Sequence, residues 1–369
     1  MRSYTVLRVW GIPIRLNISL VVFLPVLAWL IGSGSQIEVY AGLIESFAPG
    51  RLDAGALGGD QRWTVGILAA VGLFVSVALH ELGHAWAAMR YDIEVQSITL
   101  WILGGLASLS DVPKEWNREL WIALAGPAVS LGIAVVCLAG LGAVPTSLPV
   151  AVFVIGWLGV TNLVLTVFNL LPAFPMDGGR VLRALLARSR SYASATRTAA
   201  SVGKGFAILF AVFGVLAFSP LFLLLALFVY GAAASESRMV VLGELLEGLT
   251  VADLATNEDS VSRNATVGDT LRRLMRDRRT NLPVTDGGRV VGAVTAAGLR
   301  DIDPDDFETT IDALVEADLP RLDAETDAFD ALAALNEAGG VAIVERDGEP
   351  VGVISVEDFA TFLEIRSGG

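Results

Sequence analysis

Long apolar stretches separated by short polar segments make up about the first two thirds of the chain. An α-helix needs about 20 mostly apolar residues to cross the hydrocarbon core of a bilayer. Six stretches approach this length and predict six membrane-spanning helices. They lie near residues 16–33, 63–90, 119–142, 149–171, 203–218 and 219–235. The first stretch lacks a clear small-residue cleavage site, so we interpret it as a retained span and not as a signal peptide.

Beyond about residue 240 the apolar runs shorten to the length of β-strands, and the pattern repeats. Residues 281–299 (NLPVTDGGRVVGAVTAAGL) overlay residues 341–359 (VAIVERDGEPVGVISVEDF), which aligns Gly292 with Gly352. Each copy has the pattern of helix, short strand, turn, short strand and helix. The sequence therefore predicts a polytopic α-helical membrane domain followed by an α/β tandem repeat. We place their bounds at 1–240, 249–303 and 307–365.

Composition and charge support the same division. The chain is 54% hydrophobic with a mean hydropathy of +0.62, which is too apolar for a soluble globular protein of this size. The formal charge is +3 over residues 1–243 and −16 over residues 244–369, in agreement with the total of −13. With one cysteine, Cys137, the chain cannot form an internal disulfide.

The distribution of positive charge predicts the orientation in the membrane. Arginines at positions 2, 8 and 15 precede the first predicted span, and six further cations lie between the fourth span and the first residues of the fifth. These are Arg180, Arg183, Arg188, Arg190, Arg197 and Lys204. The segments 34–62 and 143–148 contain few positive charges. By the positive-inside rule, we expect a multi-pass protein of the cell membrane with both termini and the acidic tail in the cytoplasm.

The only two histidines of the chain, His80 and His84, lie in the sequence HELGH within the second predicted span. Residues four apart project from one face of a helix, which suits two ligands of one metal ion, and Glu81 is able to reach a metal-bound water. His80 lies roughly 25 Å along the span, nearer its cytoplasmic end. Ionisable groups at that depth are costly and indicate function. The alternative is two unrelated histidines of the core.

Catalytic zinc usually has three protein ligands and one open position, so a third ligand is needed. The best candidate is Asp177 in FNLLPAFPMDGGR, residues 168–180. Pro172 and Pro175 end the preceding helix, and the two glycines after Asp177 permit a tight turn on irregular backbone. Such backbone occurs at membrane depth only when it is buried in protein or lines a wet cavity. A surface turn that contains an aspartate is the alternative.

HELGH followed by N-x-x-P-x-P-x-D-G resembles the site-2 protease family of intramembrane zinc metalloproteases, over roughly residues 8–235. The resemblance implies one zinc ion held by His80, His84 and Asp177, with Glu81 as the catalytic acid and base. It also implies that Asn169 contacts the substrate backbone or the transition state. The segments 100–111 (LWILGGLASLSD) and 123–132 (ALAGPAVSLG) resemble the glycine-rich hairpin of the family and the helix start that follows it.

The activity implied is hydrolysis of peptide bonds in or near the transmembrane segments of membrane proteins within the lipid bilayer, with no nucleic-acid partner. Glu81 would take a proton from the attacking water and pass it to the leaving amine. A substrate helix must unwind before cleavage. We expect an extended strand such as 96–102 to hold the unwound segment by edge pairing.

The C-terminal repeat resembles a pair of CBS modules, a resemblance that implies an adenine-nucleotide site. The second copy has the nucleotide signature from Gly352 to Asp358, in which Ser355 would contact a phosphate (AMP or ATP) and Asp358 the ribose. The first copy has Thr295 but Gly298 in place of the aspartate, so one intact site is expected. The charge of −16 disfavours a polyphosphate unless a metal or salt screens it. The alternative is a structural pair that mediates homodimerisation.

Two other classes of protein compete with a protease. A CBS-gated channel or transporter would have ionisable pathways and repeated halves in the membrane domain, whereas the predicted spans contain no internal repeat. A catalytically inactive scaffold of the same fold would tolerate the loss of key residues, whereas His80, Glu81, His84 and Asp177 are all present.

Overall fold

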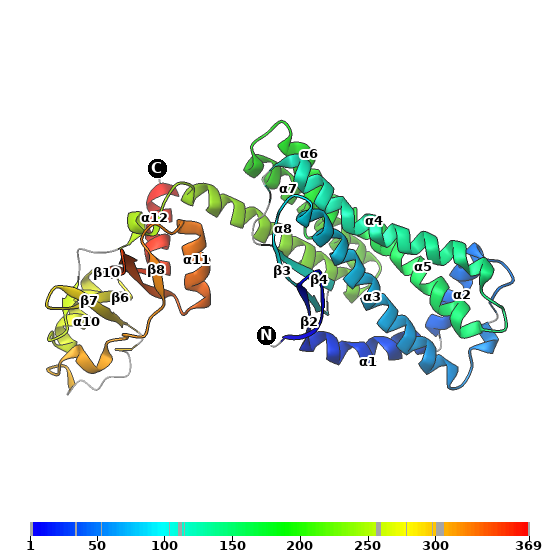
Figure 1. The fold of residues 1–369 in the computed structure, drawn as a ribbon, viewed down its shortest axis with the longest axis horizontal. Helices are drawn as coiled ribbons and strands as arrows, with labels where there is room; N and C mark the ends of the chain where they lie inside the picture. Colours follow the sequence, from blue (N-terminus) through cyan, green and yellow to red (C-terminus); the bar gives the residue numbers. More distant parts are fainter. Residues whose placement is uncertain are drawn as a thin grey trace. The chain divides into compact units, whose positions relative to one another are not determined.

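The computed structural model describes residues 3–33, 35–52, 54–102, 104–109, 113, 115–255, 260–277, 279–296, 298–299 and 306–367. Arg2 and three residues of the predicted hairpin (103, 110 and 111) lie outside these ranges. The chain divides into two compact units, Met1–Arg238 and Met239–Gly369, which are described separately here. Figure 1 shows mainly helices with a small sheet in the first unit, and mixed helices and strands in the second.

Five helices among the described residues are long and apolar enough to cross a membrane. They are α3 (Gln61–Met89), α4 (Trp116–Gly140), α5 (Pro149–Asn169), α7 (Tyr192–Leu216) and α8 (Pro220–Leu246). Two shorter helices, α1 (Ile18–Gly32) and α2 (Ser35–Phe47), qualify as a sixth span only if the bent pair is one crossing. The predicted polytopic helical domain of about six spans is confirmed.

The helix bounds differ from the predicted spans by one to three residues at most ends and by about eleven at two ends. The first begins at Ile18 and not at 16, because the preceding residues form a strand and the side chain of Asn17 caps the helix by accepting from Ser19 N. The fifth helix begins at Tyr192 instead of 203, and the sixth continues to Leu246 instead of 235. In both cases the helix extends beyond the apolar window, because polar residues continue a helix wherever its backbone hydrogen bonds are kept.

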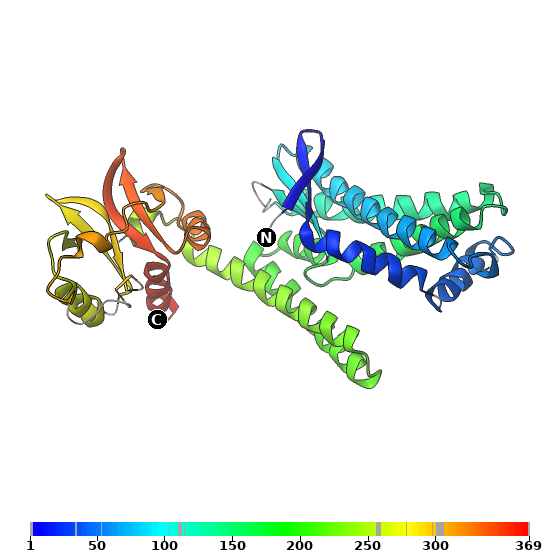
Figure 2. The ribbon, with the colours of Figure 1, turned by 90° about the horizontal axis from the view of Figure 1, so that it is seen from below.

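A four-stranded sheet packs beside the C-terminal half of α3. It comprises β1 (Ser3–Val9), β2 (Ile12–Asn17), β3 (Val95–Trp101) and β4 (Gly104–Leu109), in the order β1-β2-β3-β4. The β1–β2 hairpin precedes α1 directly (Figure 2). The strand predicted at 96–102 therefore exists as β3, but it is not an edge strand, because β2 pairs with it in parallel and β4 in antiparallel fashion. The prediction that this strand offers a free edge is wrong; on this side of the sheet the edge strand is β4.

Close packing of α3 against its neighbours fixes the core of the first unit. Buried residues of α1, α3 and β3 form one apolar cluster, which includes Leu20, Ala85 and Ile98. A Cβ atom at Gly66 of α3 would lie 2.1 Å from the carbonyl oxygen of Ala28 in α1, so only glycine allows the observed approach of these two helices.

After α5 the chain forms the loop 170–176 and the short helix α6 (Asp177–Ala187).

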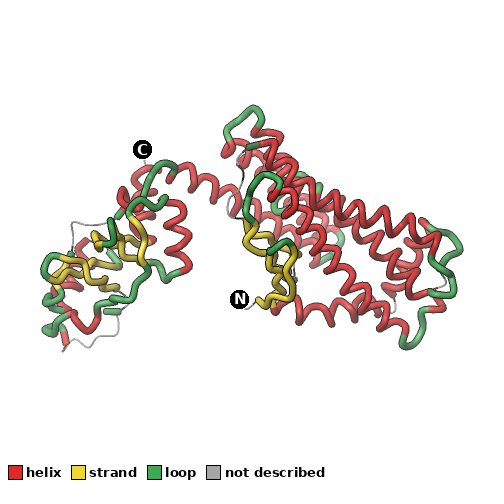
Figure 3. The backbone as a smooth tube through the Cα atoms, in the orientation of Figure 1, coloured by secondary structure: helices red, strands yellow, loops and turns green. Residues whose placement is uncertain are grey.

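The second unit contains two similar three-stranded sheets (Figure 3). The first consists of β5 (Val261–Ser262), β6 (Asn281–Asp286) and β7 (Arg289–Thr295), and the second of β8 (Arg321–Asp323), β9 (Val341–Arg346) and β10 (Glu349–Ser355). Their helices are α9 (Val251–Leu254), α10 (Val267–Asp277), α11 (Ala328–Glu337) and α12 (Val356–Ser367). Each sheet contains the antiparallel hairpin that the repeat predicts, and a short additional strand, β5 or β8, pairs in parallel with the first strand of the hairpin.

Candidate metal centre

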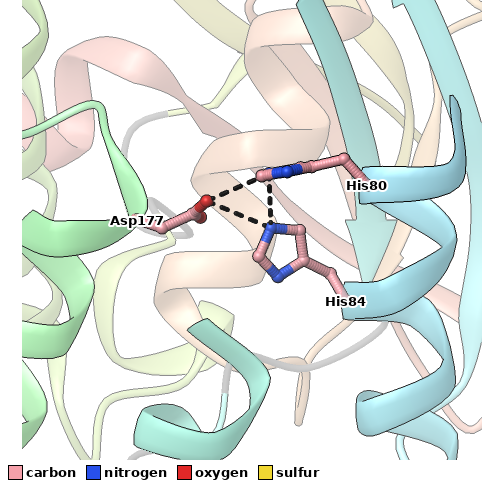
Figure 4. A group of neighbouring side chains, drawn as sticks. All are labelled: His80, His84 and Asp177. Atoms are coloured by element: carbon pink, nitrogen blue, oxygen red, sulfur yellow. Dashed lines mark hydrogen bonds and ion pairs between the residues drawn. The ribbon is translucent and has the colours of Figure 1, made fainter. Parts of the chain in front are cut away.

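Helix α3 places both histidines in the interior of the first unit. His80 is 4% and His84 is 6% exposed, and their ring centroids lie 4.8 Å apart. The spacing of four residues puts both rings on one face of the helix, and that face is turned towards α4 and α6 (Figure 4). A helix buried on this side thus holds two imidazoles next to each other.

Asp177 reaches the histidines from a different element. It is the first residue of α6, directly after the proline-containing loop that follows α5. Its Oδ2 atom lies 3.1 Å from Nε2 of His80 and 3.2 Å from Nε2 of His84, and the two Nε2 atoms are 3.2 Å apart (Figure 4). The structure brings together the three residues that the sequence singles out as candidate ligands.

The three atoms fit a tetrahedral zinc ion. Bonds of about 2.0–2.1 Å at tetrahedral angles separate neighbouring ligand atoms by roughly 3.3 Å, close to the observed 3.1–3.2 Å. Nδ1 of His84 lies 2.7 Å from the carbonyl oxygen of Ile122, which can only accept, so Nδ1 carries the hydrogen and Nε2 of the neutral ring presents a lone pair. Nδ1 of His80 lies 2.9 Å from Oγ of Ser130, which can accept in the same way. A cation between the Nε2 atoms and the carboxylate would stabilise these converging lone pairs.

Gly126 of α4 leaves the space that the imidazoles occupy. A Cβ atom there would lie 2.2 Å from Nε2 of His84 and 2.7 Å from Nε2 of His80. Any side chain at this position would therefore displace the candidate ligand atoms. Sequence reasoning noted the segment 123–132 only for its resemblance and did not identify Gly126, Ser130 or Ile122 as parts of the site.

Glu81 lies next to the histidine pair and against the edge strand of the sheet. Its side chain is partly buried, and a Cβ atom at Gly105 of β4 would lie 2.3 Å from Cγ of Glu81. The glycine-rich strand thus allows its backbone to pass directly beside this carboxylate. Any chain that pairs with β4 would run close to Glu81.

Asn169 is the last residue of α5 and is partly buried. Within the described residues no hydrogen bond or ion pair joins it to His80, His84 or Asp177, so its role stays a prediction.

A different asparagine of α5, Asn162, is fully buried and donates from Nδ2 to Oγ of Ser76 at 3.1 Å. This bond ties α5 to α3 one turn before His80; a polar residue within an apolar span was the signal that could have revealed it.

A buried ion cluster holds α6 in place. Nε of Arg183 donates to Oε1 of Glu119 in α4 at 2.7 Å, and Arg183 also pairs with Glu236 of α8. Arg183 is 2% and Glu119 is 0% exposed. Arg183 thus differs from the solvent-exposed cation that its place in the loop between spans suggested, because a buried guanidinium neutralised by carboxylates contributes little to the orientation of a loop. Two turns after Asp177, it fixes the helix that presents this carboxylate.

In the second unit, the candidate nucleotide contacts form hydrogen bonds with other protein groups, within the second copy for Ser355 and between the two copies for Thr295. Ser355 donates from N and from Oγ to Oδ2 of Asp358, each at 2.8 Å. Oγ1 of Thr295 donates to Oε1 of Glu316 at 2.8 Å, and N of Gly298 donates to Oγ1 of Thr295. Asp358 thus bonds Ser355 in the second copy, whereas Gly298 offers only its backbone N at the matching position of the first, and the nucleotide site stays a prediction.

An acidic cleft of about 460 Å³ lies beside Asp358. Its charged lining residues are Asp253, Asp277, Arg279, Glu357, Asp358 and Glu364. Hydrogen bonds from the backbone and side chain of Thr250 hold the pKa of Asp253 below its usual value, and hydrogen bonding from Arg276 does the same for the pKa of Asp277. Both carboxylates are therefore charged at neutral pH, and the cleft is strongly anionic.

Fold and site together define a polytopic membrane protein that carries a candidate metal centre among its helices and a C-terminal α/β pair. The family model of peptidase family M50 matches residues 68–152 and 146–212, and that of the CBS domain matches residues 251–304 and 311–365. A zinc metalloprotease of Methanocaldococcus jannaschii is 31% identical over 369 residues, covering 98% of this chain and 96% of its own. The chain therefore belongs to peptidase family M50, the site-2 protease family, and carries a pair of CBS domains.

Two further proteins are similar to this chain. A Synechocystis protein that is provisionally named a zinc metalloprotease is 31% identical over 324 residues, covering 81% of this chain and 83% of its own. The solved structure of a site-2 protease from Methanocaldococcus jannaschii is 34% identical and covers 64% of this chain and 96% of its own, with a TM-score of 0.43.

Proposed function

We propose that this protein is a zinc-dependent endopeptidase that hydrolyses peptide bonds in or near the transmembrane segments of membrane proteins. The observation that carries the proposal is the mutual separation of 3.1–3.2 Å among Nε2 of His80, Nε2 of His84 and Oδ2 of Asp177. Two of these atoms belong to a candidate membrane span. We assign the three residues as the ligands of one zinc ion.

The proposed chemistry divides among residues around the ion. Zinc, when bound, supplies a Lewis acid that polarises the scissile carbonyl and acidifies water. The carboxylate of Glu81 accepts a proton from the attacking water and passes it to the nitrogen of the leaving amine. Ser130 and the carbonyl of Ile122 hold the imidazoles in the tautomer that keeps each Nε2 available. We retain Asn169 as a candidate for contact with the substrate.

We propose β4 as the strand that holds an unwound substrate segment. It is the edge strand of its sheet, and its Gly105 lies against Glu81. Unpaired backbone groups of an edge strand can add an extended peptide through main-chain hydrogen bonds. A peptide held there would have its amide bonds within a short distance of the proposed acid and base.

We also propose that both termini and the CBS pair lie in the cytoplasm of a cell-membrane protein. Once the buried Arg183 is set aside, five cations still lie between the fourth predicted span and the first residues of the fifth, and Arg8 and Arg15 precede the first helix. This distribution supports the orientation by the positive-inside rule. For the domain bounds we keep 1–240, 249–303 and 307–365.

The proposed role of the CBS pair is regulation by an adenine nucleotide bound at Ser355 and Asp358, within a homodimer that the pair mediates. The anionic lining of the cleft beside Asp358 opposes a polyphosphate. We therefore expect AMP to bind more strongly than ATP when no divalent cation is present.

The test uses the full chain in lipid nanodiscs with a set of single-span membrane proteins as probes, and it measures zinc per chain and new N-termini by mass spectrometry. Wild type should contain one zinc ion and cleave within or beside a span. Glu81→Gln should keep the zinc and lose cleavage, whereas His80→Ala should lose both. Cleavage by Glu81→Gln would refute the assigned chemistry, and metal-loaded wild type without any cleavage would favour the inactive scaffold.

A further inference from the structure

A groove of about 330 Å³ opens on the first unit where the end of α3 meets the start of α4. Aromatic and small side chains line it: Trp86, Arg90 and Tyr91 at the end of α3, and Trp121, Ala125 and Ala128 of α4. Trp86 is 57% and Trp121 is 61% exposed, so two indoles stand at an open surface. Because α3 and α4 are both candidate spans, this surface faces lipid and not water.

The groove is separate from the candidate metal centre. Successive residues of an α-helix are about 100° apart around its axis, so the mean direction of Trp121, Ala125 and Ala128 lies roughly 130° from that of Ile122, Gly126 and Ser130. The latter three face the histidines. The same helix thus presents one face to the candidate metal centre and another to the groove, and what binds in the groove does not depend on the proposed function.

Side chains around the groove place it at the boundary between hydrocarbon and headgroups. Arg90 directly follows the last residue of α3 and is exposed. Arg118 lies over the ring of Tyr91 at 5.9 Å, and Arg188 lies over the ring of Trp116 at 5.4 Å. Tryptophan, tyrosine and arginine are the residues that anchor spans at the membrane interface. The groove therefore begins at headgroup level and continues towards the hydrocarbon core.

Charge distinguishes among the possible occupants. Arg90 is the one charged residue in the groove lining, and it makes no ion pair with any residue that the structure describes. We propose that the groove binds one anionic phospholipid, with an acyl chain between Trp86 and Trp121 and the phosphate at the guanidinium of Arg90. The alanines leave space for the chain, the indoles flank it, and the unpaired cation selects for negative charge.

Native mass spectrometry of the full chain tests this proposal. The protein is released from micelles that contain equal amounts of phosphatidylglycerol and phosphatidylcholine with the same acyl chains. Near a membrane surface one basic residue favours an anionic lipid by about five-fold, so wild type should retain one phosphatidylglycerol in roughly that excess. Arg90→Gln should lower the ratio to about one, and Trp121→Ala should lower the retention of both lipids.

Arg62→Gln is the matched control, because Arg62 is also exposed but lies at the opposite end of α3. It should leave the ratio unchanged, and all variants should keep the helix content of wild type by circular dichroism, which shows that they are folded. Equal retention of the two lipids by wild type overturns the proposal, as does an unchanged preference in Arg90→Gln. Displacement of the lipid by a single-span peptide at equimolar concentration would assign the groove to a protein segment and would also overturn it.

Discussion

Replacement of Gly126 by alanine tests the candidate metal centre through a residue that supplies no ligand atom. The new Cβ atom would lie 2.2 Å from Nε2 of His84 and 2.7 Å from Nε2 of His80. Carbon and nitrogen atoms in contact stay about 3.5 Å apart, so the ring of His84 must withdraw by more than about 1 Å or α4 must move away. Zinc sites tolerate deviations of only about 0.2 Å in their bond lengths.

The expected result is a loss of zinc affinity of about 100-fold or more, at the upper end of what neighbouring residues of metal ligands contribute. The affinity is measured by competition with a chelator of known strength, together with zinc per chain by mass spectrometry and helix content by circular dichroism. Gly132→Ala in the same helix is the control, because no described atom lies within 4 Å of its Cβ position. If Gly126→Ala binds zinc as wild type does, the ion does not lie between these imidazoles and the reasoning fails.

Further predictions concern the metal, the ion cluster and the CBS pair. Asp177→Asn keeps the volume but removes the charge, and equilibrium dialysis should show weaker zinc binding; unchanged binding would exclude Asp177 as a ligand. Removal of metal by a chelator should abolish cleavage, and Zn²⁺ but not Mg²⁺ should restore it, because imidazole donors suit zinc and Mg²⁺ prefers oxygen. Arg183→Met leaves the fully buried Glu119 without its main partner and should lower the free energy of unfolding by about 3–5 kcal/mol, whereas adding Glu119→Leu should recover most of that loss in SDS denaturation. Equal free energies of unfolding for Arg183→Met and for the double variant would count against a stabilising ion pair between Arg183 and Glu119. Calorimetry of the full chain should show stronger binding of AMP than of ATP without Mg²⁺, and Asp358→Ala should weaken it; an absence of heat up to millimolar AMP would favour a structural role for the pair.

The histidine pair could be predicted because its geometry is local. A spacing of four residues fixes the relative position of two side chains once the segment is helical, and the apolar length of the segment predicts the helix. Asp177 lies 97 residues after His80, so no local geometry joins them; the need for a third ligand made it a candidate, and the resemblance to a family strengthened that assignment. The proline and glycine pattern predicted irregular backbone, which residues 170–176 form, but the predicted tight turn after Asp177 is wrong, because Asp177 and both glycines begin α6. The pattern did not indicate the direction in which the carboxylate points.

The features that sequence reasoning missed depend on contacts between elements. The burial of β2 alternates along Ile12, Ile14 and their neighbours, a period of two that marks a strand, but the adjoining apolar run obscured it. The order of strands places β3 in the middle of the sheet, and no pattern within 96–102 contains that information. Similarly, the identity of Arg183 as a cation did not reveal that Glu119, on another helix, neutralises it.

Helix α4 supplies none of the three candidate ligands, yet it positions all of them. Ser130 contacts Nδ1 of His80, the carbonyl of Ile122 contacts Nδ1 of His84, and Gly126 leaves room for both rings. Glu119 binds Arg183 and so fixes the helix that begins at Asp177. These four residues are separated by three or four positions and therefore share one face of α4. The precision of the site thus depends on the rotation of α4 about its own axis, because a small rotation would disturb the partners of both histidines and the anchor of α6 at the same time.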